Sequence, residues 1–419
     1  ALGVYEASLN GSRVGDFILA PGWTVYQKRL QVQQYDLRIR PGQENELTVV
    51  VGAGWYRGRL AGWLPDQHGN AALPAALTAE LTLRYPDGHA DTICTDASWQ
   101  TAESAVRFSE LYDGETYDAA FEPPVWTPAV IYDGPTDTLI EQQGEPVSEQ
   151  ERIAPARIFK TPAGETVVDF GQNLTGYVEI ALDGAKGEAV ELSHAEVLDK
   201  NGNFYTENYR SAKAKYLYFC KDGVQRYKPK LTFYGFRYVR IDRFPGGVQT
   251  AVPENFTAIA VHSDMKRTGY LSCSDPLLNK LFENVIWGQK GNFLDVPTDC
   301  PQRDERLGWT GDAQVFIRTA CLNFDAERFF TKWLADLAAD QREDGAVGHV
   351  IPNILRQCGS AAWDDAATIC PWAVYLAYGD PNILCAQFAS MKKWVDYITA
   401  HTTTKDLWTG GEHYGDWLG

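Results

Sequence analysis

The spacing of apolar residues changes near residue 265, and this change constrains the fold more than any other feature of the sequence. Before it, segments such as ENELTVVVGAGWY and PKLTFYGFRYVRIDRF are rich in β-branched and aromatic residues, which is typical of strands. After it, apolar residues recur at helical spacing, as in Leu277, Leu278, Leu281, Phe282 and Val285. The pattern therefore predicts β structure followed by an all-helical region.

Turn signals and prolines divide the β-rich part. Asn10-Gly11 and Pro86-Asp87-Gly88 each separate two short strand patterns, as expected for hairpins. Residues 131–158 have weak periodicity and several prolines, which indicates a linker or crossover. We expect a first β-sandwich at 1–130, a linker at 131–158 and a second β-sandwich at 159–262.

The helical region is expected to span residues 263–419. Asp275 precedes Pro276, which is a good N-cap followed by proline in the first turn of a helix. The segments AERFFTKWLADLAADQ, Ala366–Tyr378 and AQFASMKKWVDYITA repeat the helical pattern. Thr310 is expected to cap a further helix, while Trp372 and Trp394 are expected in the helical core.

Composition excludes several classes of function. A net charge of −17 opposes binding to nucleic acid, and no run of about 18 apolar residues could span a membrane. The eight cysteines form no CxxC pair, which favours reduced thiols and a cytoplasmic location. No metal or other cofactor is expected, and the oligomeric state stays open. Both ends look cut, so we expect a portion of a longer protein.

The stretch DVPTDCPQRDERLGWTGD at 295–312 concentrates acidic, basic and aromatic residues in an irregular loop. A solvated surface loop and a shaped pocket both fit this composition. A pocket of this kind suits a sugar, because carboxylates and arginine bind hydroxyl groups and an indole covers the apolar face of the ring. Crowded carboxyl groups also keep one member protonated, as a general acid in glycoside cleavage requires.

The sequence DVPTDCPQRDERLGWTGDAQVF resembles the signature of bacterial α-L-rhamnosidases of glycoside hydrolase family 78. NGSRVGDFILAPGWTVYQKRLQVQQYD and VVDFGQNLTGYVEI resemble the N-terminal and second β domains of that family, so the resemblance covers nearly the whole chain. It implies the first part of an (α/α)6 barrel after about residue 265. It also implies hydrolysis of terminal α-L-rhamnose, from a glycoside or polysaccharide, with inversion of configuration.

By resemblance, Glu305 matches the general acid of the family. The residues that match its rhamnose-binding positions are Asp299, Arg303, Trp309 and Asp312, with weaker matches at Trp363 and Trp417. Asp304 and Arg306 are expected to brace the loop. No residue of this chain matches the general base of the family, so the 419 residues alone are expected to be inactive.

Two other hypotheses remain open. One is a different α/α-barrel glycosidase, or a lyase, that acts on rhamnose-containing polysaccharide. The other is a carbohydrate-binding fragment without catalysis, in which Trp23, Trp55 or Trp63 of the first β domain would form a platform for a sugar, with or without calcium held by nearby acidic side chains.

Overall fold

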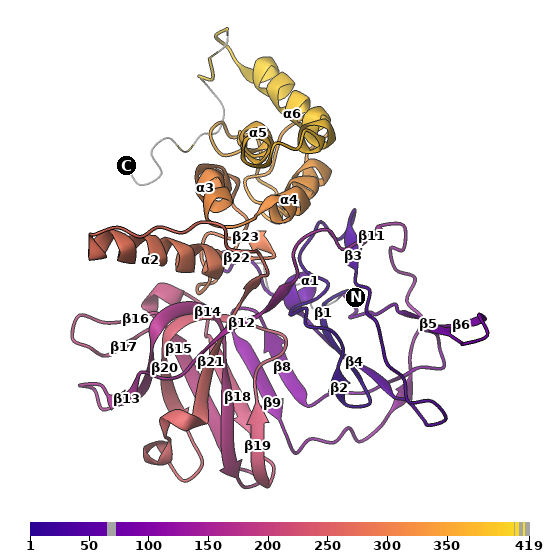
Figure 1. Ribbon diagram of the computed structural model, residues 1–419, viewed down its shortest axis with the longest axis vertical. Coiled ribbons are helices and arrows are strands. Elements are labelled where there is room, and N and C mark those ends of the chain that lie inside the picture. The colour runs from indigo at the N-terminus through magenta and orange to yellow at the C-terminus, as the bar shows by residue number, and fades with distance from the viewer. Residues whose placement is uncertain (65–72, 406, 410–413, 415–419) are drawn as a thin grey trace.

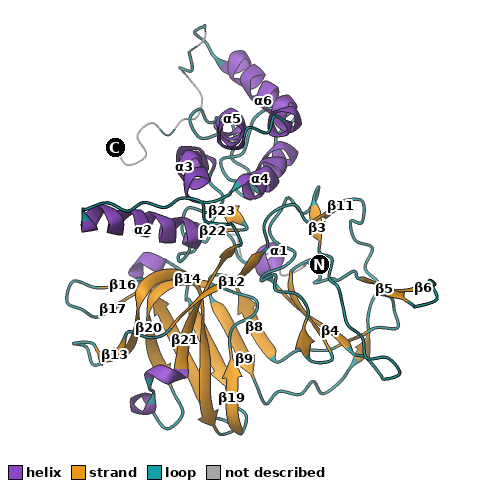
Figure 2. Ribbon diagram, viewed as in Figure 1, coloured by secondary structure: helices purple, strands orange, loops and turns teal. Residues whose placement is uncertain are grey.

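A computed structural model describes residues 1–64, 73–405, 407–409 and 414 of the chain. Strands fill one part of the molecule and helices α2–α6 gather at one end of it (Figures 1 and 2). Within the described residues, every helix is too short or too polar to cross a lipid bilayer.

The first β region consists of small sheets. Its three-stranded sheet has the order β2-β1-β4, and Leu9 pairs with Ser12 across Asn10-Gly11, which confirms the predicted hairpin. The predicted turn at 86–88 joins β5 to β6. The elements are β1 (Val4–Leu9), β2 (Ser12–Arg13), β3 (Leu30–Val32), β4 (Leu47–Gly52), α1 (Gly54–Arg57), β5 (Glu80–Arg84), β6 (Ala90–Cys94), β7 (Gln100–Thr101), β10 (Thr127–Pro128) and β11 (Leu139–Glu141).

A ten-stranded sheet forms the second β region, with the order β12-β21-β14-β20-β15-β18-β9-β8 and with β13 and β19 paired to β14. Its strands are β8 (Val106–Glu110), β9 (Gly114–Asp118), β12 (Val147–Ile153), β13 (Arg157–Lys160), β14 (Thr166–Gly184), β15 (Ala189–Ala195), β18 (Lys215–Phe219), β19 (Gly223–Tyr227), β20 (Tyr234–Arg243) and β21 (Phe256–Ser263). Shorter elements nearby are β16 (Val197–Leu198), β17 (Phe204–Tyr205), and 3-10 turns at Glu207–Tyr209, Val248–Thr250 and Pro253–Asn255.

The boundaries between the β regions differ from the prediction. Strands β8 and β9 come from the predicted first sandwich, yet they extend the large sheet because β9 pairs in parallel with β18. Strand β12 comes from the predicted linker and pairs with β21 at the sheet edge. An edge strand tolerates polar residues, so the sequence VSEQERI has no clear strand pattern. Residues 1–130 therefore do not form a separate sandwich.

The helices lie close to where the sequence predicts them: α2 (Pro276–Asn292), α3 (Thr310–Asn323), α4 (Glu327–Asp340), α5 (Ala366–Tyr378) and α6 (Asn382–His401). Helix α2 packs on β14 and β21, and α5 contacts α3, α4 and α6. Asp275 caps α2 by accepting a 2.8 Å hydrogen bond from Leu277 N. Thr310 does not cap α3: it is the first helical residue, and its hydroxyl donates to His349 O.

One continuous hydrophobic core joins the three regions. Trp394 is buried in this core, as predicted. Trp372 was also predicted in the core, but it is 50% exposed, so that prediction is wrong. Trp23 and Trp55 stack on each other with ring centroids 5.8 Å apart and are buried. Neither can serve as a platform for a sugar. The eight cysteines are all unpaired, in line with the predicted thiols.

A buried ion network also links the regions. Lys332 of α4 is 1% exposed, and its ammonium donates to Asp295 Oδ2 at 2.8 Å, to Asp295 O at 3.0 Å and to Trp23 O. Trp23 N donates to the same Asp295 carboxylate. Asp336 lies 3.8 Å from the ammonium and accepts a 2.8 Å hydrogen bond from Arg29 Nε. The network fixes the N-terminal segment against the start of the acid-rich loop.

Candidate active site

The acid-rich loop is closed by two hydrogen bonds between its ends. It follows a short hairpin of β22 (Phe293–Leu294) and β23 (Val296–Pro297) and precedes α3. Asp299 N donates to Leu307 O at 3.1 Å, and Leu307 N donates to Asp299 Oδ1 at 2.9 Å. Arg306 has a φ of 54°, a left-handed conformation that turns the chain back toward Asp299.

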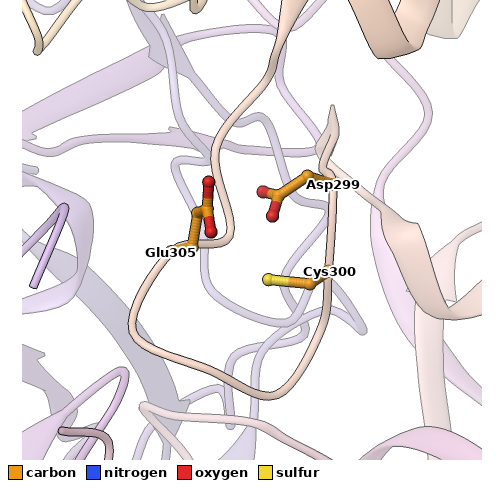
Figure 3. Close-up of side chains that lie close together, drawn as sticks. All are labelled: Asp299, Cys300 and Glu305. Atoms are coloured by element: carbon orange, nitrogen blue, oxygen red, sulfur yellow. The ribbon is translucent and has the colours of Figure 1, made fainter. Parts of the chain in front are cut away.

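Three of the side chains predicted to form the site meet on Glu305 or beside it. Arg303 donates from Nε to Glu305 Oε2 at 2.9 Å and from Nη2 to Asp299 Oδ2 at 3.0 Å, so one guanidinium joins both carboxylates. Trp309 Nε1 donates to Glu305 Oε1 at 3.0 Å. The carboxyl groups of Asp299 and Glu305 face each other across the loop (Figure 3). Glu305 is 8% exposed, so the loop is not a solvated charge cluster.

Burial and the neighbouring Glu305 carboxylate affect the protonation of Asp299. Burial, and then the Glu305 carboxylate, raise the pKa of Asp299 to about 7. Asp299 therefore retains its proton up to near neutral pH, next to the Glu305 carboxylate. A site that retains a proton at this pH can supply one to a leaving group.

A metal ion fits this cluster poorly. Oxygen atoms of Asp299 and Glu305 and the sulfur of Cys300 all lie within 4.8 Å of one another. Burial and the Asp299 carboxylate raise the pKa of the Cys300 thiol, which disfavours the thiolate that binds metals. The Arg303 guanidinium already forms an ion pair with each of the two carboxylates. Two carboxyl groups joined by a guanidinium can accept and donate hydrogen bonds, so this cluster suits the hydroxyl groups of a ligand better than a metal cation.

Arg306 and Asp304 hold the loop in place through buried hydrogen bonds. The Arg306 guanidinium is buried and donates to four backbone carbonyls, those of Leu111, Phe233, Gln302 and Arg303. Asp304 is 2% exposed and accepts hydrogen bonds from the backbone N and the hydroxyl of Ser211. These contacts agree with the bracing role expected for both residues.

Arg210 was not predicted as part of the site. Its Nη1 donates to Glu305 Oε2 at 3.0 Å and lies 3.9 Å from Asp304 Oδ1. It follows the 3-10 turn Glu207–Tyr209 of the second β region, 95 residues before Glu305. No local sequence signal could connect the two residues, because the contact depends on how the β region packs against the loop.

A cavity of about 630 Å³ lies beside the loop, between α2, α3 and the segment 362–363. Asp299, Asp312 and Trp363 are among the residues that line it. Asp312 is in the first turn of α3, where its side chain is exposed. The Trp363 ring covers Gly311, where a Cβ atom would lie 2.7 Å from the ring. Trp417, the remaining predicted site residue, lies outside the described residues.

Three family models match consecutive parts of the chain. The α-L-rhamnosidase N-terminal domain matches residues 1–151, and the concanavalin-like domain of bacterial α-L-rhamnosidase matches residues 159–262. The six-hairpin glycosidase domain of bacterial α-L-rhamnosidase matches residues 266–419. The loop, α3 and the cavity all fall within the third match.

The similar proteins are longer than this chain. An α-L-rhamnosidase of Streptomyces avermitilis is 42% identical over 433 residues, which cover 100% of this chain and 41% of that protein. The crystal structure of a Streptomyces avermitilis α-L-rhamnosidase complexed with L-rhamnose matches 100% of this chain and 41% of its own, with a TM-score of 0.92 and 39% identity. The α-L-rhamnosidase of Aspergillus terreus matches 94% of this chain and 47% of its own, with a TM-score of 0.87 and 38% identity. The chain thus spans less than half the length of these relatives.

Proposed function

Because three models of one family together match nearly its whole length, the chain belongs to the bacterial α-L-rhamnosidases, and we propose that the complete protein hydrolyses terminal α-L-rhamnosides. The relative crystallised with L-rhamnose supports this substrate. The observation that carries the proposal is the buried pair of Asp299 and Glu305, which retains a proton near pH 7 beside a cavity of about 630 Å³.

We assign the roles as follows. Glu305 is the general acid, which protonates the glycosidic oxygen as the leaving group departs. Its carboxyl group is oriented by Trp309 and by Arg303, which also holds Asp299. Asp299 and Asp312 bind rhamnose hydroxyls, while the Trp363 ring covers an apolar face of the sugar at the cavity wall.

Asp299 is not the general base. An inverting glycosidase places its acid and its base on opposite faces of the sugar, with a water molecule beside the base. Asp299 and Glu305 bind a single guanidinium, so no sugar ring fits between them. We infer that the base lies in a part of the protein that this chain does not contain, that the helices here begin an (α/α)6 barrel, and that the 419 residues alone are inactive.

The variant Glu305→Gln in the complete protein tests the role of Glu305. It keeps the shape of the side chain and removes the proton donor, so hydrolysis of an alkyl α-L-rhamnoside should fall by about 10²–10⁴-fold. Hydrolysis of a dinitrophenyl α-L-rhamnoside should fall much less, since that leaving group departs without protonation. Inhibition by rhamnose should persist.

Asp304→Asn is the matched control. The amide oxygen of the new side chain would still accept a hydrogen bond from Ser211, so turnover should fall far less than in Glu305→Gln. A larger loss in the Asp304 variant would reverse the assignment of the acid. Proton NMR early in the reaction should detect β-L-rhamnose first; α-L-rhamnose as the first product would exclude inversion.

A further inference from the structure

Trp63 stands exposed next to the general acid, although it belongs to the first β region. Its side chain is 43% exposed, whereas Trp23 and Trp55 of the same region are buried. The guanidinium of Arg210 lies over the Trp63 ring at 6.0 Å from the centroid, and the same group donates to Glu305 at 3.0 Å. Arg210 thus connects the indole to the Glu305 carboxylate.

The backbone before Trp63 is fixed to the acid-rich loop. Gly62 N donates to Asp304 O at 2.8 Å. Ala61 N donates to the hydroxyl of Tyr112 at 3.1 Å, and that hydroxyl donates to Glu305 O at 2.6 Å. A Cβ atom at Gly62 would lie 2.3 Å from Asp304 Oδ2, so only glycine allows this close approach. Trp63 therefore has a defined position relative to Glu305.

Trp63 and Arg210 also lie apart from the cavity assigned to rhamnose. That cavity is lined by residues of α2, α3, the segment 297–299 and the segment 362–363, so Asp299 faces it, whereas Glu305, Arg210 and Trp63 are not among its lining residues. A general acid lies between the sugar that is released and the group that leaves, because it protonates the oxygen that joins them. The side of Glu305 that faces Arg210 and Trp63 is then the side of the leaving group.

We propose that Trp63 and Arg210 form a subsite for the leaving group and select leaving groups that contain a six-membered ring. The exposed indole stacks on the ring, whether this is a pyranose or an aryl group, and the guanidinium donates to an oxygen substituent of the ring. This inference rests on the proposed function, since it requires that Glu305 protonate the glycosidic oxygen.

The test is the selectivity of the complete protein, measured as kcat/KM for a rhamnosyl-glucose disaccharide divided by kcat/KM for methyl α-L-rhamnoside. An aryl α-L-rhamnoside replaces the disaccharide in a second arm. Loss of the stacking contact in Trp63→Ala should lower the ratio about tenfold. Trp63→Phe keeps an aromatic ring and should retain most of the selectivity ratio of the unmutated protein. Trp126→Ala is the control, because Trp126 is 50% exposed in the same β region and makes no described contact with the loop.

The arms separate the sources of the ring. A fall with the disaccharide alone indicates a sugar as leaving group, and a fall with the aryl rhamnoside alone indicates an aromatic one. An unchanged ratio in Trp63→Ala with both substrates overturns the subsite while the proposed function stands. If the unmutated protein hydrolyses none of the three rhamnosides, the proposed function fails and the subsite falls with it.

Discussion

Replacing Lys332 with methionine should destabilise the protein strongly, because Lys332 holds together the buried ion network between the N-terminal segment and α4. Methionine has nearly the same shape and lacks the ammonium. The variant leaves Asp295 and Asp336, which are 3% and 0% exposed, without this cation, and leaves the carbonyls of Trp23 and Asp295 without its hydrogen bonds. Removing one partner of a buried ion pair costs about 3–5 kcal/mol.

The loss of folding stability in Lys332→Met should depend on pH. Burial raises the pKa of Asp336 to about 6 even with Lys332 and Arg29 beside it, and loss of the lysine should raise it further. A carboxyl whose pKa is higher in the folded state binds its proton more tightly there than in the unfolded state, so stability falls as pH rises toward the folded pKa. The penalty of Lys332→Met should therefore be larger at pH 8 than at pH 5.5.

Thermal unfolding of the complete protein at these two pH values measures the effect. The control is Lys392→Met on α6, which removes an exposed lysine paired with Asp396 and should change stability by no more than about 0.5 kcal/mol. The double variant Lys332→Met/Asp295→Asn should recover part of the loss, since it removes one unpaired carboxylate. If Lys332→Met and Lys392→Met have the same Tm at pH 8, the buried network does not stabilise the fold. If Lys332→Met loses more stability at pH 5.5 than at pH 8, the linkage to Asp336 is refuted.

Two further predictions concern the site. Because the pKa of Asp299 is raised to about 7, kcat/KM should decline as pH rises above about 7. The variant Asp299→Asn has no proton to lose in this range and should remove the decline; an unchanged pH profile would contradict a role for the Asp299 proton. Gly311→Ala should raise the inhibition constant for rhamnose several-fold, because the new methyl group would lie 2.7 Å from the Trp363 ring and displace it; an unchanged inhibition constant would contradict the role given to this ring.

Local features were predictable from the sequence. The cap at Asp275 and the hairpin at Asn10-Gly11 depend on neighbouring residues alone, and both occur as expected. Asp299, Arg303, Glu305 and Trp309 lie together because a short loop closes on itself, so their proximity in sequence becomes proximity in space. The catalytic and binding roles given to them stay predictions.

Features that depend on packing between distant segments were not predictable. Strand β8 lies in the predicted first sandwich and β12 in the predicted linker, and neither sequence carries information about the sheet that the strand joins. Trp372 and Trp394 lie in similar helical patterns, yet only Trp394 faces the core. Arg210 reaches Glu305 from the second β region, and no property of its neighbours in the sequence indicates this.

The four carbonyls that hold Arg306 have a consequence for engineering. Leu111 and Phe233 both precede residue 265, so half of the acceptors for this guanidinium come from the β regions. A chimera that joins only the helices to an unrelated fold, with its junction at residue 265, would leave a buried cation facing two missing oxygens. Because the acceptors are backbone oxygens, β regions that pack on the loop in the same way would supply them, whereas helices produced without any β region would lack them.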